Sequence, residues 1–231
     1  MKKSNILLVA GFLAMVVFIS AIHISLYAKY KAGDYTIYHA DEDLLADALQ
    51  TFPNIAFVSV RNVPNATVKF SDVAKVEKLD KDDLQYSRRG DTLVISASED
   101  VDRDRISGRV LYVPYNATLD VSNSSLSIVP AKGTANSKPV IYLKKSVVWF
   151  AGGTKSPFQL GQVKVIATDS SSVAFHGNTQ VASLDVQLSR SSLEYADGDF
   201  GQLSIATDSL SHISLLSKHL LKAAIKTIAP Q

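Results

Sequence analysis

The chain has no cysteine. Disulfide bridges, thiolate metal ligands, a cysteine nucleophile and a lipidated N-terminal cysteine are therefore all excluded, whereas the cellular compartment stays open. Glycine is scarce as well, with 11 in 231 residues, and no Walker, Rossmann or G-x-S-x-G pattern occurs. The five histidines form no HxH or HExxH pair, which leaves zinc chemistry without support. We expect no cofactor, no bound metal, no catalytic residues and no enzymatic activity.

An excess of charge of one sign is also lacking. The net charge is +2, and four lysines precede the first acid at Asp34, so the remaining 20 bases face 22 acids. A protein that binds nucleic acid usually gathers Lys and Arg into a basic patch or stripe. No such surface is indicated here, and we expect no nucleic-acid partner.

One hydrophobic run is long. Residues 5–27 carry no obligatory charge, and at about 1.5 Å per helical residue they would span roughly 34 Å, enough for a hydrocarbon core of about 30 Å. We predict a transmembrane helix over 5–27 behind a short cytoplasmic tail of residues 1–4. A cleaved signal peptide is the alternative, but Leu26 stands where a cleavage site needs a small residue. The lysine bias is slight and favours export of the large domain.

Residues 28–51 are predicted to form a linker that contains a short helix. In the segment 41–52, DEDLLADALQTF, acids fill the first turn and apolar residues from Leu44 to Leu49 share one face. Pro53 prevents the pattern from continuing. We expect this amphipathic helix to pack on the domain that follows.

From residue 55 onward, short apolar runs alternate with polar residues. The segments IAFVSVRNV, ATVKFSDV, DTLVISAS and RVLYVPY place apolar residues at alternate positions and are punctuated by Asn, Gly and Pro. These are signals of β-strands. The charged segment 75–92 among them is predicted to be a solvated hairpin or loop. The fold class is therefore all-β over the domain 52–228.

After Leu119 the strands repeat with a nearly constant period. Pairs of apolar residues two positions apart recur at steps of 22, 22, 21, 19 and 20 residues, and a second series advances with the first. A repeat of this length cannot bury its own apolar face and must stack on its neighbours. We predict a single-stranded β-solenoid with coils of about 20 residues, in which consecutive pairs of each series touch. The first series is Leu119 and Val121, Ile141 and Leu143, Val163 and Val165, Leu184 and Val186, Leu203 and Ile205, Ala223 and Ile225. The second is Leu126 and Ile128, Val148 and Phe150, Val173 and Phe175, Leu193 and Tyr195, Ile213 and Leu215.

Serine-rich segments separate the two series. We interpret TDSSS (168–172), SRSS (189–192) and TDSLSH (207–212) as corners, because small hydroxylated residues tolerate tight turns and bond their own backbone. Their serines are expected to be structural.

The C-terminal segment LLSKHLLKAAIKTI fits two structures. Its lysines fall four apart, as on a helix, whereas Leu221, Ala223 and Ile225 alternate as in a strand. We favour a last strand, because it keeps the 20-residue step. Either form would cap the end of the stack.

Candidate functional residues are few. Asp185, Glu194, Asp197 and Asp199 could gather near one edge, as in β-helix enzymes that cut polysaccharides, but no repeated basic residue accompanies them. We interpret them as solvated acids.

The single tryptophan, Trp149, lies between Val148 and Phe150. If these two point inward, Trp149 points outward, and we predict that it is a possible ligand contact. The alternative is that a nearby loop covers it.

The order of the motifs resembles that of the GIN domain family, known as auto-transporter adhesin head domains. An opening of the type F-x-x-I-x-V, here IAFVSV and VKF, precedes a G-x-T-L-x-I strand, here GDTLVIS at 90–96, and then Ser-rich coils. The resemblance covers about residues 52–228 and departs from the family in having serine in place of Gly and Asn at the corners. It implies a right-handed β-solenoid, an exported location at the bacterial envelope, and no established enzymatic activity.

We therefore expect a non-enzymatic, single-pass protein of the bacterial cell membrane, with its main domain in the periplasm. Its β-solenoid would act as a binding, adhesin-like or structural module for envelope glycan or protein. One alternative is a bactofilin-like membrane-associated scaffold that polymerises end to end, which needs uncovered ends. Another is a polysaccharide-active β-helix enzyme, which needs clustered acids with a basic partner.

Overall fold

The computed structural model describes residues 11–13, 15–25, 49–77, 84–97, 109–131, 133–152, 157–195 and 198–229. The chain divides into two compact units, Met1–Ala46 and Asp47–Gln231.

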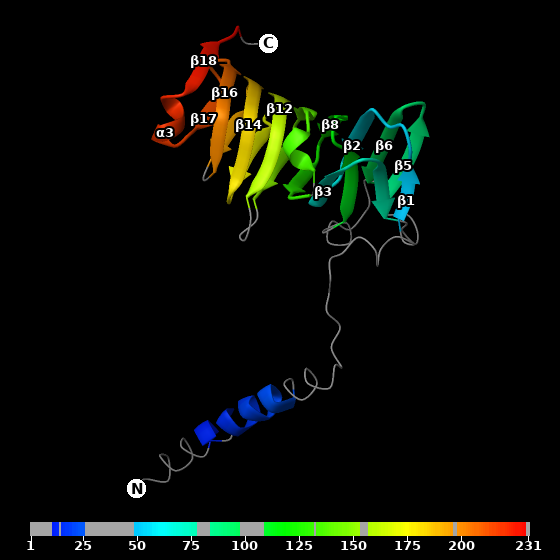
Figure 1. Ribbon diagram of the computed structural model, residues 1–231, viewed down its shortest axis with the longest axis vertical. Coiled ribbons are helices and arrows are strands. Elements are labelled where there is room, and N and C mark those ends of the chain that lie inside the picture. The colour runs from blue at the N-terminus through cyan, green and yellow to red at the C-terminus, as the bar shows by residue number, and fades with distance from the viewer. Residues whose placement is uncertain are drawn as a thin grey trace. The chain divides into compact units, whose positions relative to one another are not determined.

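In the first unit, residues 11–13 and 15–25 are helical (Figure 1, dark blue). Among the described residues, no helix combines the length and the hydropathy that a bilayer span requires. These helical residues fall within the segment 5–27, over which the anchor is predicted. The rest of that segment, the tail 1–4 and the linker up to residue 48 lie outside the described residues.

The second unit is all-β and contains two nine-stranded sheets (Figure 1). Sheet A consists, in spatial order, of β1 (Leu49–Phe52), β4 (Ala74–Glu77), β7 (Val110–Pro114), β3 (Ala66–Ser71), β9 (Ser125–Val129), β11 (Val147–Ala151), β13 (Ser172–His176), β15 (Ser192–Tyr195) and β17 (His212–Ser214). Sheet B consists of β18 (Ala223–Thr227), β16 (Asp199–Thr207), β14 (Thr179–Ser189), β12 (Phe158–Thr168), β10 (Val140–Lys144), β8 (Thr118–Ser122), β2 (Phe57–Arg61), β6 (Thr92–Ala97) and β5 (Leu84–Arg89). Two short helical turns accompany them, η2 (Thr134–Asn136) and α3 (Ser217–Leu220).

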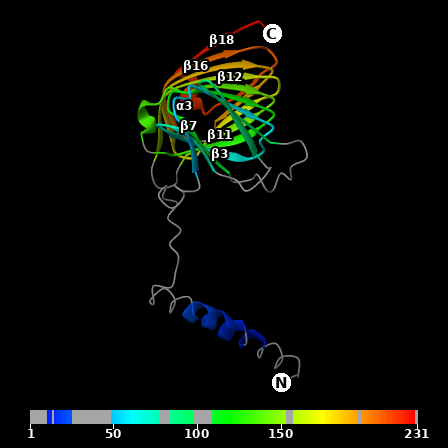
Figure 2. The same ribbon diagram turned by 90° about the vertical axis from the view of Figure 1, so that its right-hand side faces the viewer.

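The predicted β-solenoid is confirmed. From β8 to β17 the chain makes five successive coils, and each coil is a sheet B strand followed by a sheet A strand. Corresponding strands of neighbouring coils pair in parallel. Seen end-on, the strands enclose an interior (Figure 2) that holds the apolar core.

The second predicted series lies in register as expected. Val148 pairs with Leu126 on one side and with Val173 on the other, and Val173 pairs with Leu193. These residues are fully buried, because period-two alternation directs every second side chain inward. The rings of Phe150 and Phe175 stack with centroids 4.4 Å apart, one coil above the other.

The first series is in register except at one step. Ile141 pairs with Leu119 as predicted, but its partner in the next coil is Val165, not Val163, so the prediction was wrong by two residues there. A shift of two leaves every side chain on its original face, so the apolar pattern cannot reveal it. The hydrogen bond from Lys164 N–H to Pro139 O, at 3.1 Å, agrees with this register.

The coil has a third side, formed by the first residues of the long strands β12, β14 and β16. In β12 the buried positions shift phase at Gly161, where the strand bends. Glycine is required there, because a Cβ atom on Gly161 would lie 2.4 Å from Ser137 O, and one on Gly201 in β16 would lie 2.6 Å from Ala182 O. The bend brings Phe158 and Phe200 into the core.

The first coil of the sequence is not the first of the stack. β2 lies between β6 and β8, and β3 lies between β7 and β9. The connection from β7 to β8 passes along the β2–β3 coil, with Tyr115 N–H donating to Ser71 O at 3.0 Å and Thr118 N–H to Ala56 O at 2.9 Å. Phe57 thus pairs with Thr92 and Thr118, so stack neighbours here are not about 20 residues apart in sequence.

The short helix predicted over 41–52 is wrong where the structure describes it. Leu49–Phe52 form β1, which pairs antiparallel with β4, and residues 41–48 lie outside the described part. Leu49 and Phe52 are buried while the residues between them are exposed. The open backbone edge of β4 satisfies the hydrogen-bonding groups of this segment, which outweighs its helical pattern.

At the C-terminal end, the favoured last strand is confirmed: β18 pairs parallel with β16, with Ile225 opposite Ile205. The helical alternative is confined to one turn, α3, whose His219 ring packs edge-on against Phe200 at 5.3 Å. The expected cap is incomplete, since Ile225 remains 46% exposed.

A charge at an inward position should unfold the solenoid. Val173→Asp places a carboxylate between Val148 and Leu193, and we expect a loss of about 3–5 kcal/mol in the free energy of unfolding. Denaturant titration measures the change. Gln187→Asp, on the half-buried outer face of β14, is the control and should leave the midpoint nearly unchanged. A wild-type midpoint for Val173→Asp would contradict the inward placement.

Candidate binding surfaces

The corners between sheet B and sheet A share one local motif. A residue with positive φ is followed by a buried serine, whose small side chain fits inside the turn. These pairs are Asn123 and Ser124, Lys145 and Ser146, Ser170 and Ser171, Arg190 and Ser191.

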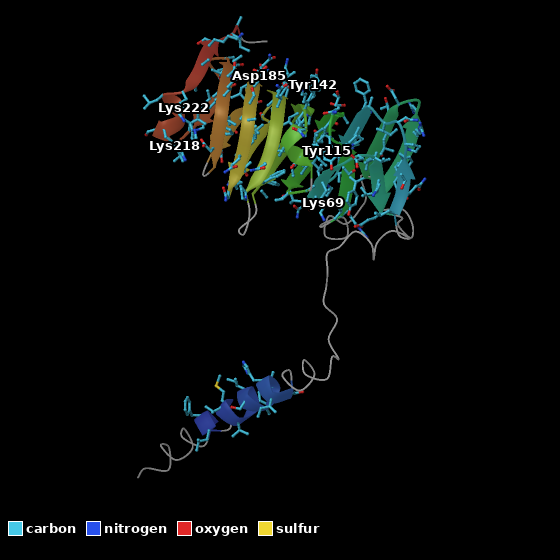
Figure 3. The ribbon with its side chains drawn as sticks, viewed as in Figure 1. Lys69, Tyr115, Tyr142, Asp185, Lys218 and Lys222 are labelled. Atoms are coloured by element: carbon cyan, nitrogen blue, oxygen red, sulfur yellow. The ribbon has the colours of Figure 1, made fainter. Side chains whose placement is uncertain are left out.

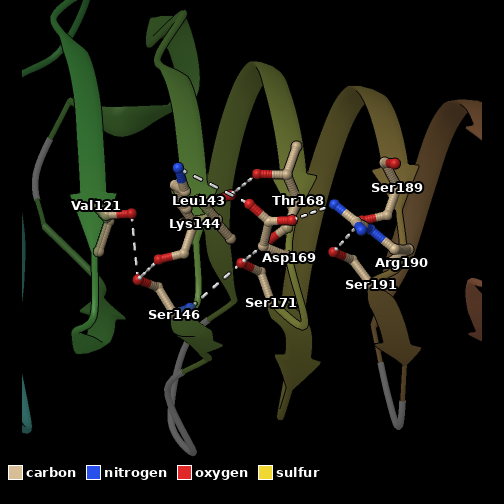
Figure 4. Close-up of polar contacts among 10 residues, drawn as sticks. All are labelled: Val121, Leu143, Lys144, Ser146, Thr168, Asp169, Ser171, Ser189, Arg190 and Ser191. Carbon is tan, nitrogen blue, oxygen red and sulfur yellow. Dashed lines mark hydrogen bonds and ion pairs between the residues drawn. The ribbon is translucent and has the colours of Figure 1, made fainter. Parts of the chain in front are cut away.

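The buried corner serines form a hydrogen-bonded ladder, part of which Figure 4 shows. The Ser146 hydroxyl donates to Lys144 O at 2.8 Å and accepts the N–H of Ser124 at 3.2 Å. Ser146 N–H in turn donates to Ser171 Oγ at 3.2 Å. Each hydroxyl thus satisfies polar backbone groups that the turn would otherwise bury unpaired. The expectation that these serines are structural is confirmed.

At the last corner, the buried side chain that accepts hydrogen bonds is that of Asp208. Its buried carboxylate accepts hydrogen bonds from Ser211 Oγ at 2.6 Å, Arg190 N–H at 3.0 Å, Ser189 Oγ at 3.1 Å and Leu210 N–H at 3.2 Å. The bond from Ser211 is the main reason why the pKa of Asp208 lies below its ordinary value. The carboxylate is therefore charged at neutral pH, and its oxygens accept hydrogen bonds from its own corner and from the preceding one.

Ion pairs link the outside of adjacent corners. Asp169 contacts Arg190 of the following coil and lies 3.9 Å from Lys144 of the preceding one (Figure 4). The three side chains are partly exposed, so the contribution to stability is about 1 kcal/mol or less per pair. These contacts align coils and leave no carboxylate free for catalysis at this position.

The candidate acids do not converge. Asp185 lies on the outer face of sheet B, Glu194 on the outer face of sheet A, and Asp199 at the start of β16 on the third side. Asp197 lies outside the described residues. Among the residues that the structure describes, no group of three His, Cys, Asp or Glu is placed to hold a metal ion.

Trp149 lies on the outer face of sheet A. It sits between the fully buried Val148 and Phe150, and its cross-strand neighbours are Ser127 and Ala174. The side chain is half-buried, and residues 153–156 after it lie outside the described part. Its role in ligand contact stays a prediction.

The outer face of sheet B carries two exposed aromatic residues on strands that lie two apart in the sheet. Phe57 in β2 is 47% exposed. Tyr142 in β10, labelled in Figure 3, is 42% exposed. One strand, β8, separates them. Given strand spacings of about 4.8 Å and a two-residue offset along the strand, their Cα atoms lie about 12 Å apart.

A hydrogen-bonded polar network lies beside these aromatic residues. Arg61 Nε donates to Ser59 Oγ at 3.1 Å, and Ser59 Oγ donates to Asp120 Oδ2 at 3.2 Å. Asp120 is the direct cross-strand neighbour of both Ser59 and Tyr142. Ser59 is buried, so it holds the two charged groups in place. We call Phe57, Ser59, Arg61, Asp120 and Tyr142 the aromatic face.

Sequence reasoning missed the aromatic face, although one of its signals was visible. Phe57 adjoins the inward Val58, and Tyr142 stands between the inward Ile141 and Leu143, so alternation alone points both rings outward. Their placement two strands apart on one face was not visible, because it depends on the displaced β2–β3 coil, which puts β2 next to β8.

In comparisons with known proteins, the chain matches no family model, no curated protein and no solved structure.

Removal of a ladder hydroxyl should destabilise the corner. We expect Ser146→Ala to lower the free energy of unfolding by about 1–3 kcal/mol, because Ser124 N–H loses its acceptor inside a buried turn. Chemical denaturation measures the loss. Ser204→Ala, at an exposed position of β16, is the matched control. An equal effect of the two substitutions would contradict the ladder.

Proposed function

We propose that the chain is a non-enzymatic, membrane-anchored protein of the bacterial envelope whose β-solenoid binds envelope glycan. The observation that carries this proposal is the aromatic face, in which Ser59 hydrogen-bonds both Asp120 and Arg61 beside two exposed rings. Exposed rings stack on the apolar faces of sugars, and fixed charged groups donate to and accept from their hydroxyls. The resemblance to GIN domains, with the right-handed winding that it implies, is consistent with an adhesin-like role.

The location at a membrane belongs to the same proposal. Its support is the uncharged run 5–27 in the sequence and the helical conformation of residues 11–13 and 15–25. We place the Asp47–Gln231 unit in the periplasm.

The two alternatives receive less support. A polymerising scaffold needs uncovered ends, whereas here β1, β4 and β5 cover one end of the sheets with antiparallel pairing. A polysaccharide-cleaving enzyme needs paired acids, and those described lie on different sides of the coil.

Glycan binding should depend on the aromatic face. We expect Tyr142→Ser and Phe57→Ser each to weaken the retention of the full chain by about tenfold in affinity electrophoresis through gels containing cell-wall polysaccharide, because each removes a stacking ring. Gln187→Ser, on the same outer face but two strands beyond Tyr142, is the control and should migrate as wild type.

Trp149→Ser distinguishes the two sheets. If this change alone releases the chain from the gel, binding occurs on sheet A and the aromatic face is not the site. If no polysaccharide retards the unaltered chain, glycan binding is refuted.

The proposed topology predicts protease sensitivity from outside. In spheroplasts of cells that express the full chain, added protease should degrade the Asp47–Gln231 unit, because it would face the periplasm. Immunoblotting of the C-terminal segment measures its loss, and a cytoplasmic protein serves as the intactness control. Complete protection in intact spheroplasts, with digestion after lysis, would place the unit in the cytoplasm.

A further inference from the structure

Exposed apolar side chains concentrate at the C-terminal end of the solenoid. Of the seven exposed large hydrophobic residues described in the Asp47–Gln231 unit, five lie between Leu210 and Ile225. Leu221, directly after α3, is 91% exposed, and Leu220 is 49% exposed. A leucine so fully exposed is unusual beside a well-packed core and indicates a contact surface.

The position of this end in the stack explains part of the exposure. Ile225 continues the inward series, opposite Ile205, but β18 is the last strand of sheet B in the described part of the chain. No further coil covers Ile225 there. The missing coil does not explain the exposure of Leu216, Leu220 and Leu221, because these residues belong to the turn that contains α3.

The same segment is basic throughout. Lys218, Lys222 and Lys226 are exposed, and residues 209–231 contain no acid. Lys218 lies in α3, and Lys222 follows two residues after the end of α3 (Figure 3). The preceding acid, Asp208, is occupied by its own corner. Burial lowers the pKa of His219, and the negative charge of Asp199 acts against this lowering. Asp199 is therefore an acid whose charge reaches this region. We call Leu216, Lys218, Leu220, Leu221, Lys222, Ile225 and Lys226 the terminal surface.

Two kinds of partner, a second copy of the chain and a membrane, could bury these leucines. The charge of the neighbouring lysines distinguishes between them. A second copy docked end to end in a symmetric pair would face three lysines with three lysines. Lysine on an edge strand, such as Lys226 on β18, also opposes strand addition. An anionic bilayer meets both requirements, because it accepts apolar side chains at its interface and attracts lysines to its surface.

We propose that the terminal surface docks on an anionic lipid membrane, with the leucines around α3 entering the interface and the three lysines lying against lipid phosphates. This contact does not rest on the aromatic face or on the predicted N-terminal anchor, and it would give the solenoid its own attachment to lipid.

A single-cysteine label tests the contact in the full chain. The chain has no cysteine of its own, so Leu221→Cys carries an environment-sensitive fluorophore at one site, and Ser87→Cys on β5, at the other end of sheet B, carries it as a control. The labelled chains are mixed with vesicles of phosphatidylcholine alone or with added phosphatidylglycerol. We expect a blue shift and quenching by brominated acyl chains for the label at position 221 only with the anionic vesicles, and no change at position 87.

A charge-matched pair of variants tests the lysines. Each lysine near an anionic surface strengthens binding about fivefold, so replacing Lys218, Lys222 and Lys226 by Gln should lower the ratio of docked to undocked label roughly a hundredfold. The same three-charge removal in the middle of the solenoid, at Lys144, Lys145 and Lys164, should leave the ratio nearly unchanged.

Three outcomes would overturn the proposal. The first is the same signal from position 221 in neutral and anionic vesicles. Such a signal would not depend on lipid charge, and insertion of the predicted anchor into both kinds of vesicle would explain it. The second is no signal in either. The third is a blue shift that needs no lipid and grows with protein concentration, which would assign the terminal surface to a second copy of the chain.

Discussion

The solenoid depends on one constraint: a single coil cannot bury its own apolar side chains, so each must lie in parallel register on its neighbours. Val148, Val173 and Leu193 show the result, with equivalent residues of successive coils in contact and fully buried. The stacked rings of Phe150 and Phe175 follow from the same register. Because the interior is filled by this packing, any ligand must meet the outer faces, the corners or the ends.

The corners use their polar groups internally. A turn that buries backbone N–H and C=O groups needs a partner for each, and the hydroxyls of Ser124, Ser146 and Ser171 supply it without adding bulk. Asp208 does the same with a charge. The buried serines of these segments therefore have a structural role, although a serine-rich segment resembles a candidate site. The proposed contacts are therefore assigned to the aromatic face and to the terminal surface, and Trp149 on sheet A stays a further predicted contact.

The two ends of the stack are built differently. At one end the chain doubles back, and antiparallel β1, β4 and β5 close the sheets. At the other, β18 and α3 leave leucines and lysines in solvent. Unlike ends disfavour repeated end-to-end addition, and they let one end hold a contact that the other cannot.

The sequence by itself determined the fold class, the two inward series after Leu119, the structural serines and the last strand, because all of these are repeated or alternating patterns along the chain. It also placed Trp149 on an outer face. It could not determine the register of Ile141 against Val165, since a slip of two residues preserves the pattern.

Tertiary structure alone decided the remainder. The displaced β2–β3 coil breaks the period of about 20 residues. The sequence pattern therefore did not reveal the packing of residues before Leu119 or the placement of Phe57 and Tyr142 on one face. The open edge of β4 turned Leu49–Phe52 from a helical pattern into a strand. In each case the deciding partner lies far away along the chain, where local periodicity carries no information about it.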